Sequence, residues 1–116
     1  MKRALEIRTY TLKPGAGPAF HNLFVKQSLP MLKRWEIDVV AYGPSLHDSD
    51  AYYLMRSYAD LRGMRQSEAA FYGSDEWRQG PREAILALID SYTSIVIEAD
   101  EALLQQLRKK VASGQS

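Results

Sequence analysis

The sequence predicts an α+β protein with the element order βαββαβ, followed by one further helix. Four segments are rich in β-branched or aromatic residues and alternate in polarity with a period of two, which is typical of strands. Helical periodicity separates the first strand from the second and the third from the fourth. A short polar loop joins the second and third strands, which predicts an antiparallel hairpin.

The first strand is predicted at residues 5–12, in the stretch LEIRTYTLKPG, and ends before a Pro-Gly pair. Its two faces differ in chemistry. One face carries an acid, a cation and a phenol in succession, namely Glu6, Arg8 and Tyr10. If this face is buried, it forms either a polar network or the wall of a pocket.

A helix is predicted at residues 18–33. Pro18 suits its first turn, because the N–H that proline lacks has no partner there. Pro30 lies inside the same periodic pattern, and proline removes one helical hydrogen bond. We therefore expect the helix to kink or end near residue 29.

The later elements follow from the same signals. Asp60 and Asp100 are expected to cap two of the helices, because aspartate side chains accept hydrogen bonds from first-turn N–H groups. Residues 113–116 are expected to be loose. In order, we predict a strand at 36–43, a polar loop at 44–50, a strand at 51–58, a helix at 61–72, a short turn around Trp77, a helical segment at 82–89, a strand at 91–99 and a helix at 101–112.

Right-handed crossovers place the first and third strands at the centre of one four-stranded antiparallel sheet, with the helices on one face. This is the ferredoxin-like arrangement. Both faces of the sheet carry apolar or aromatic residues, and soluble monomers avoid large exposed apolar patches. We therefore predict a homodimer in which two sheets pack face to face and enclose a barrel. The final helix could lie on its own sheet or reach the partner.

Composition narrows the classes of function. The 116 residues fit one domain spanning 1–116, with a core at about 4–99 and the C-terminal helix at 100–112. Fifteen basic and fourteen acidic residues give a net charge of +1, so nucleic acid is not an expected partner. The absence of cysteine excludes disulfides and thiolate chemistry. No apolar run suggests a membrane span or signal peptide, and we expect a cytoplasmic protein.

Arg8 and Tyr10 are the first candidate site residues. A buried arginine needs a partner, and Glu6 or Glu68 could supply one as a structural ion pair. Alternatively, Arg8 binds an anionic or carbonyl-bearing ligand and Tyr10 is hydrogen-bonded to it. Glu68 lies within the apolar stripe of its helix, so it pairs with Arg65 or faces the same pocket as Arg8.

His21 and Tyr42 complete the candidate set. His21 lies at the edge of the apolar arc of the first helix, where it is either a satisfied core imidazole or a general base. As a haem ligand it would need a roomy apolar pocket. Tyr42 belongs to a dense set of aromatic residues, most of which we expect to pack the core while a minority line a cavity.

No cofactor or metal is expected. The cluster of His47, Asp48 and Asp50 lies in the hairpin loop, where such residues ordinarily serve turns. We find no phosphate-binding loop, dinucleotide fingerprint or nucleophile elbow.

The chain resembles the NIPSNAP family of the dimeric α+β barrel superfamily. The resemblance rests on EIRTY at residues 6–10 with the following Pro-Gly, and on RSY at 56–58 followed by DLR at 60–62. It spans residues 4–99 and leaves the final helix outside. It implies the ferredoxin-like fold and the barrel dimer, and it implies no particular reaction. The superfamily includes cofactor-independent monooxygenases and haem-handling proteins.

We therefore expect a small dimeric protein that binds or transforms a small, partly apolar organic molecule in a pocket between sheet and helices. The chemistry would resemble that of a cofactor-independent monooxygenase or isomerase. Catalytic roles are predicted for His21 and Tyr10, and substrate-binding roles for Arg8, Tyr42 and Glu68. The alternative is a non-catalytic dimeric interaction module.

Overall fold

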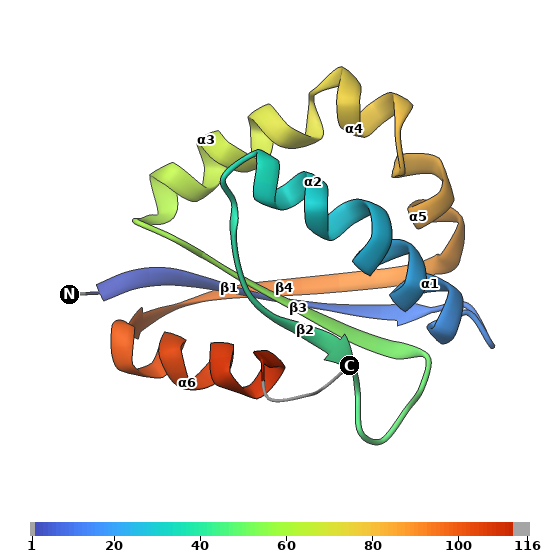
Figure 1. The fold of residues 1–116 in the computed structure, drawn as a ribbon, viewed down its shortest axis with the longest axis horizontal. Helices are drawn as coiled ribbons and strands as arrows, with labels where there is room; N and C mark the ends of the chain where they lie inside the picture. Colours follow the sequence, from blue (N-terminus) through green and yellow to red (C-terminus); the bar gives the residue numbers. More distant parts are fainter. Residues whose placement is uncertain (1, 113–116) are drawn as a thin grey trace.

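Four antiparallel strands form one sheet in the order β2-β3-β1-β4 (Figure 1). The structure is a computed structural model that describes residues 2–112, so the expectation for residues 113–116 falls outside it. The elements are β1 (Lys2–Leu12), α1 (Gly17–Leu23), η1 (Phe24–Ser28), α2 (Leu29–Arg34), β2 (Asp38–Pro44), β3 (Ala51–Tyr58), α3 (Leu61–Tyr72), α4 (Asp75–Gln79), α5 (Arg82–Leu88), β4 (Ile89–Asp100) and α6 (Glu101–Ala112).

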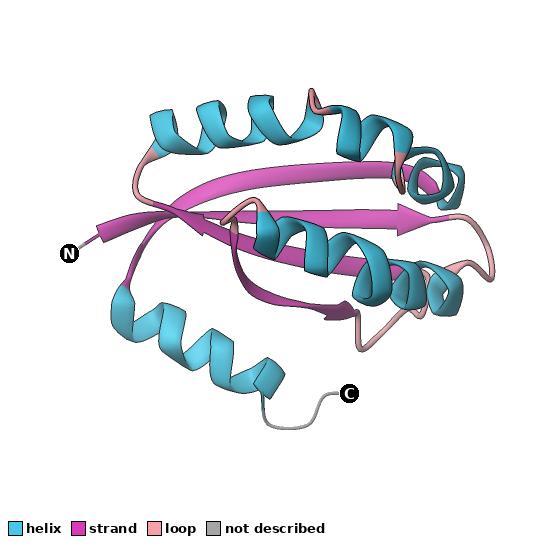
Figure 2. Cartoon of the chain, turned by 45° about the horizontal axis from the view of Figure 1, so that its top comes forward, coloured by secondary structure: helices cyan, strands magenta, loops and turns pink. Residues whose placement is uncertain are grey.

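The predicted topology is confirmed. β1 and β3 are the central strands and pair antiparallel, with Glu6 opposite Arg56 and Tyr10 opposite Tyr52. Helices α1 to α5 lie over one face of the sheet, and α6 lies under the other (Figures 1 and 2). β1 and β4 are longer than expected, since β1 begins at Lys2 and β4 starts directly after α5 at Ile89.

The first helix lies close to its predicted range of 18–33, and the predicted interruption near residue 29 takes the form of a π-helical turn. Helical structure continues past residue 29 to Arg34, and it does so through the π-helical turn η1 just before Pro30. In this turn the N–H of Leu29 donates to the carbonyl of Phe24, five residues back. A π-helical turn is a common way to absorb an interruption in the helical hydrogen-bond ladder. Pro30 is therefore accommodated without ending the helix.

The second strand corrects one predicted boundary. It begins at Asp38 and not at residue 36, because Glu36 has a φ of 59°, in the left-handed region that strands avoid. The register with β3 then shifts between Val39 and Ala41. This bulge puts Val40 and Ala41 on the same side of the sheet, so the expected alternation fails within the strand.

Helix caps agree with the sequence. The Asp60 carboxylate accepts a hydrogen bond from the N–H of Gly63 at 2.7 Å, and Asp100 accepts one from Leu103 at 2.9 Å. None of the helices in the described residues 2–112 has the length and apolar character that a membrane span requires.

The main core lies between the helices and the upper face of the sheet, and it is largely aromatic. Phe20 packs edge-on against Tyr52, with ring centroids 4.9 Å apart, and Phe71 packs edge-on against Tyr72 at the same separation. The even-numbered residues of β1 face this core, and they include the acid, cation and phenol noted in the sequence.

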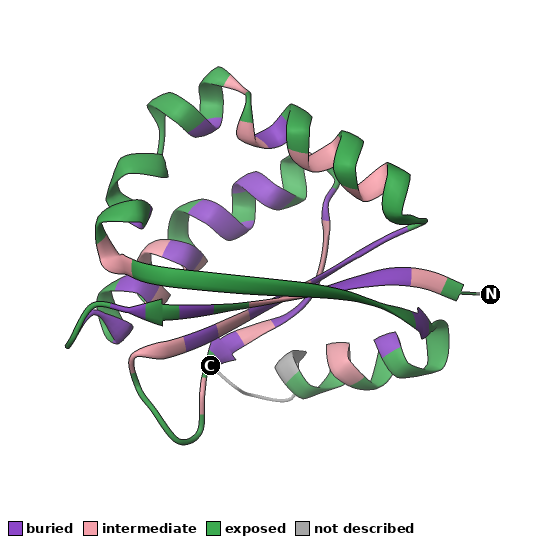
Figure 3. Cartoon of the chain, turned by 180° about the vertical axis from the view of Figure 1, so that it is seen from behind, coloured by how far each residue is buried: buried purple, intermediate pink, exposed green. Residues whose placement is uncertain are grey.

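A second, smaller core lies between α6 and the lower face of the sheet. Leu104 of α6 is fully buried there, against Leu5, Ala41 and their neighbours. The final helix therefore packs on its own sheet, which settles one of the alternatives left open. It covers only part of this face, and β4 is exposed along almost its whole length (Figure 3).

Candidate functional site

The polar face of β1 is part of a buried ion network, and its cation is already paired. Arg56 of β3 has no exposed surface and lies opposite Glu6 on the neighbouring strand. Its Nε donates to Glu6 Oε1 at 2.8 Å, and its Nη2 lies 2.8 Å from the same oxygen. Nη2 also lies 3.1 Å from Oε2 of Glu68, a residue of α3. Arg56 is therefore held by two carboxylates.

Arg8 joins the same network at its edge. Its Nη2 donates to Glu6 Oε2 at 3.1 Å and lies 3.8 Å from Glu68 Oε1. Its guanidinium carbon also lies 4.9 Å from the ring centre of Tyr92, at cation–π distance. The two arginines and two glutamates balance in formal charge, so the network has no excess positive charge for an anionic ligand.

The pKa values of the two carboxyl groups are shifted in opposite directions. Burial opposes ionisation of Glu6, but the adjacent Arg56 and Arg8 guanidinium groups hold its pKa below the ordinary value. Burial, together with the nearby Glu6 carboxylate, raises the pKa of Glu68. Glu6 is therefore the ionised partner of the arginines, and Glu68 is the group that holds a proton more readily. Tyr58 also donates to Glu68, at 2.8 Å.

Arg56 was the residue that sequence reasoning missed. No role in a site was predicted for it from the sequence. The signal was available, because pairing the first and third strands with Glu6 opposite Arg56 brings an acid and a cation together. The proposed Glu68–Arg65 pair is not among the ion pairs of residues 2–112.

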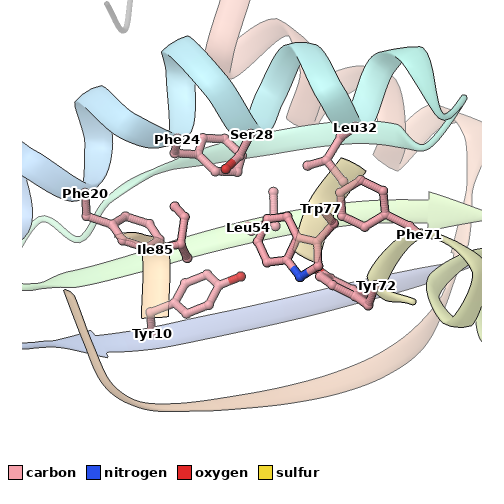
Figure 4. Close-up of a pocket in the computed structure, with 10 residues that line it drawn as sticks. All are labelled: Tyr10, Phe20, Phe24, Ser28, Leu32, Leu54, Phe71, Tyr72, Trp77 and Ile85. Carbon is pink, nitrogen blue, oxygen red and sulfur yellow. The ribbon is translucent and has the colours of Figure 1, made fainter. Parts of the chain in front are cut away.

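A small cavity lies beside this network, between the helices and the sheet (Figure 4). Its volume is about 30 Å³, which is room for about two water molecules. Its lining is mostly aromatic and aliphatic. The lining residues are Tyr10, Phe20, Phe24, Ser28, Leu32, Leu54, Phe71, Tyr72, Trp77 and Ile85.

Ser28 is the unusual member of this lining. It is the last residue of the π-helical turn η1 and is almost fully buried. A helical serine often donates to the carbonyl one turn earlier, but the Ser28 hydroxyl has no hydrogen-bond partner within residues 2–112. An unpartnered buried hydroxyl is costly, and π-helical turns are frequent at functional sites. Ser28 is therefore the most specific sign of a binding site here.

Two tyrosines face Ser28 across the cavity. Burial raises the pKa of Tyr10 to about 12, so its phenol keeps its proton at neutral pH. The Tyr72 oxygen accepts hydrogen bonds from Arg56 Nη1 at 2.8 Å and from Arg8 Nη1 at 3.4 Å. Because that oxygen is occupied as an acceptor, the Tyr72 proton is directed elsewhere. The cavity wall therefore offers hydroxyl donors and no carboxylate.

His21 and Tyr42 lie at a different place. The Nδ1 of His21 is 2.6 Å from the Tyr52 hydroxyl, and the centroid of the His21 ring lies 6.5 Å from that of the Tyr42 ring. Phe20 and Phe24 stand between this pair and the cavity, which neither His21 nor Tyr42 lines. Of the five predicted site residues, the structure brings Arg8 and Glu68 together in the network, places Tyr10 beside them, and sets His21 and Tyr42 apart.

The polar residues of the hairpin loop stabilise turns, both in the loop itself and in the segment after β1. His47 Nδ1 lies 2.6 Å from Ser45 Oγ, and Asp48 accepts from the N–H of Asp50 at 2.9 Å. Asp50 in turn accepts from the N–H groups of Gly15 and Gly17. No group of three or more potential metal ligands occurs within residues 2–112.

The fold and the site together define a small ferredoxin-like α+β domain with an aromatic cavity next to a neutral ion network. The NIPSNAP family model matches residues 5–99. The chain belongs to the NIPSNAP family, in agreement with the resemblance seen in the sequence.

Solved structures agree in fold. An uncharacterized NIPSNAP-like domain protein from Burkholderia xenovorans is 17% identical and superposes with a TM-score of 0.77, covering 85% of this chain and 86% of that one. A NIPSNAP family protein of unknown function from Agrobacterium tumefaciens is 21% identical, with a TM-score of 0.76 and coverages of 84% and 87%.

A more distant likeness lies outside the named NIPSNAP proteins. A structure from Nitrosomonas europaea, provisionally named as an antibiotic biosynthesis monooxygenase, is 12% identical, with a TM-score of 0.59 and coverages of 85% and 91%. No curated protein matches this chain in sequence. At these identities the likenesses establish the fold and not an activity.

Proposed function

We propose that this chain binds a small, partly apolar organic molecule by its carbonyl end, which enters the cavity between the helices and the sheet. The observation that carries the proposal is the buried Ser28 hydroxyl, which has no partner within residues 2–112 and lines an otherwise apolar cavity. Ligand sites are commonly apolar with a few convergent polar groups.

The polar groups of the cavity favour an acceptor on the ligand. Ser28 can donate from η1, the Tyr10 hydroxyl, whose pKa burial raises to about 12, can donate from the sheet, and the Tyr72 hydroxyl can donate from α3. A carbonyl oxygen accepts two hydrogen bonds and would satisfy Ser28 together with one tyrosine. Charged ligand groups are disfavoured inside, because both arginines of the adjacent network are already paired.

Hydrogen-bond donation to a carbonyl also stabilises the negative charge that develops on its oxygen when an enolate forms. The provisional name of the Nitrosomonas structure is in line with such chemistry. His21 does not line the cavity, so the proposal gives it no chemical step. The proposal therefore commits to binding, with Tyr10 as a donor.

The test is binding of butanone, followed by the chemical shifts of backbone amides. Saturable shifts should cluster at the cavity lining, and Ser28→Ala should weaken binding about fivefold through loss of one hydrogen bond. Ser94→Ala removes an exposed hydroxyl on β4 and should leave binding unchanged. Shifts that do not saturate, or that spread over the surface, would contradict the proposal.

A second candidate function rests on a different observation. Apolar side chains of β4 are exposed on both of its faces, including Ile95 and Tyr92. We propose that a second copy of this chain covers the lower face of the sheet, as the sequence predicts. A dimeric module that serves only protein–protein interaction would need this surface and not the cavity, and the butanone experiment separates the two functions.

A further inference from the structure

The outer edge of β4 is open along its length. β4 pairs with β1 on one side and is the last strand of the sheet, so its other side has no neighbouring strand within residues 2–112. All nine residues from Asp90 to Glu98 are exposed. In Figure 3 this strand crosses the front of the molecule, and no other helix or strand of the described residues lies in front of it. The backbone N–H and C=O groups that point away from β1 are therefore available to another strand.

The sequence of this edge lacks the features that usually prevent strand pairing. Residues 91–97 read SYTSIVI and contain no charged residue, proline or glycine. Edge strands are usually protected by lysine, proline, a bulge or a short length. β4 has twelve residues, and the register shift in its pairing with β1 lies at its start. Residues 91–97 are therefore a favourable template for a strand added from outside.

Two carboxylates flank this uncharged run. Asp90 and Glu98 are exposed, and neither has a hydrogen-bond or ion-pair partner within residues 2–112. Both belong to the face of β4 that carries Tyr92 and Val96, because alternate residues of a strand share a face. A strand added at this edge therefore meets one negative charge at each end of the run and no charge between them.

We propose that the outer edge of β4 binds an extended segment of another protein, with an uncharged centre and a basic residue at each end. The backbone of the segment would continue the sheet, and each basic residue would form an ion pair with Asp90 or Glu98. A second copy of β4 fits less well. When two copies pair antiparallel with residues 91–97 fully aligned, Asp90 lies opposite Glu98, and like charges in that position are destabilising.

The test uses the peptide KTVTTTVTK, acetylated and amidated at its ends, and a matched peptide with glutamate in place of both lysines. In the full chain, every second amide of residues 91–97 should exchange hydrogen rapidly and become protected when the lysine peptide is added. Amide chemical shifts should show that the lysine peptide binds about tenfold more tightly than the glutamate peptide, since two exposed ion pairs contribute about that factor.

Charge reversal gives the matched variants. Asp90→Lys/Glu98→Lys should bind the glutamate peptide more tightly than the lysine peptide. The control Asp75→Lys/Glu83→Lys changes two exposed acids of α4 and α5 and should keep the original preference.

Three results would overturn the proposal. One is that neither peptide binds, and another is equal affinity for both peptides or a preference that charge reversal does not invert. The third is protection of the same amides without peptide, which would mean that a second copy already occupies the edge. None of these results bears on the cavity, which the butanone experiment tests separately.

Discussion

At the residue scale, Glu6 is the member of the ion network whose substitution should lower the free energy of unfolding the most. It is buried and lies between two guanidinium groups, and its pKa is lowered because Arg56 and Arg8 favour its ionised form. Glu6→Gln leaves Arg56 fully buried with one carboxylate that protonates readily. We expect the free energy of unfolding at neutral pH to fall by about 3 kcal/mol, as for other broken buried pairs, and urea denaturation measures it.

The matched variant Glu68→Gln should differ in its pH dependence. The folded pKa of Glu68 is raised, so above the ordinary value of 4.5 the folded state keeps a proton that the unfolded state loses. This contribution to stability is present at low pH and is lost as pH rises through the folded pKa. Glu68→Gln removes that loss and should gain stability relative to wild type as pH rises above 4.5.

For Glu6 the direction is opposite. Its folded pKa lies below 4.5, so its contribution is present above that value and is lost as pH falls through the folded pKa. Glu6→Gln should therefore lose stability relative to wild type as pH rises toward 4.5. Urea midpoints between about pH 3 and pH 8 check both directions. Parallel pH profiles for the two variants would contradict the assignment of the charge to Glu6.

Substitution of Ser28 should raise the free energy of unfolding, the opposite of the effect predicted for Glu6. Its hydroxyl is buried and has no hydrogen-bond partner within residues 2–112, so removing it should relieve a desolvation cost. We expect Ser28→Ala to raise the free energy of unfolding by about 1 kcal/mol, as measured by urea denaturation. A loss of stability would mean that the hydroxyl is satisfied and that the serine is structural.

At the scale of elements, the sequence predicted the presence of each helix and strand better than its internal irregularities. The β3 strand and the α3 helix begin and end where expected, because period, loop chemistry and the Asp60 cap agree. The π-helical turn at η1 was not predictable, since it depends on how the helix recovers from Pro30. The bulge in β2 depends likewise on pairing with β3.

The docking of α6 leads to the next prediction. Leu104 is 0% exposed and fills the small core under the sheet, whereas Leu103 on the same helix is 41% exposed. Leu104→Ala should lower the free energy of unfolding by about 3 kcal/mol, through lost burial and the cavity that remains. Leu103→Ala should change it by less than about 1 kcal/mol.

Urea denaturation of the two leucine variants gives the comparison. The result tests whether α6 is part of the folded unit, because the helix lies outside the region that the family model matches. Equal effects of the two substitutions would show that α6 is not docked in solution as described.

At the scale of the whole molecule, topology was predictable and the cavity was not. Strand order followed from crossover handedness and the alternation of faces, which are local or general rules. The cavity is lined from β1, β3 and six helical segments at once, so no window of sequence reveals it. Ser28 illustrates this limit, because a polar residue in a helix attracts no notice until its surroundings are known.

The exposed surface of the molecule leads to the last prediction, which concerns assembly. Ile95 is 61% exposed on the face of β4 that borders α6, and Ile97 on the same face is 40% exposed. Part of the lower face is already covered by α6, so a partner needs to cover only the remainder. Light scattering of the pure protein should therefore give twice the mass of the 13.2 kDa chain.

Ile95→Asp places a charge in the centre of that surface and should shift the mass to that of the single chain, because a buried unpaired charge is costly. Leu46→Asp offers a matched control, since Leu46 is fully exposed in the loop between β2 and β3, and this variant should remain dimeric. Circular dichroism should show that both variants stay folded. A single-chain mass for the unmodified protein would contradict the dimer, and the apolar surface of β4 would then require a different partner.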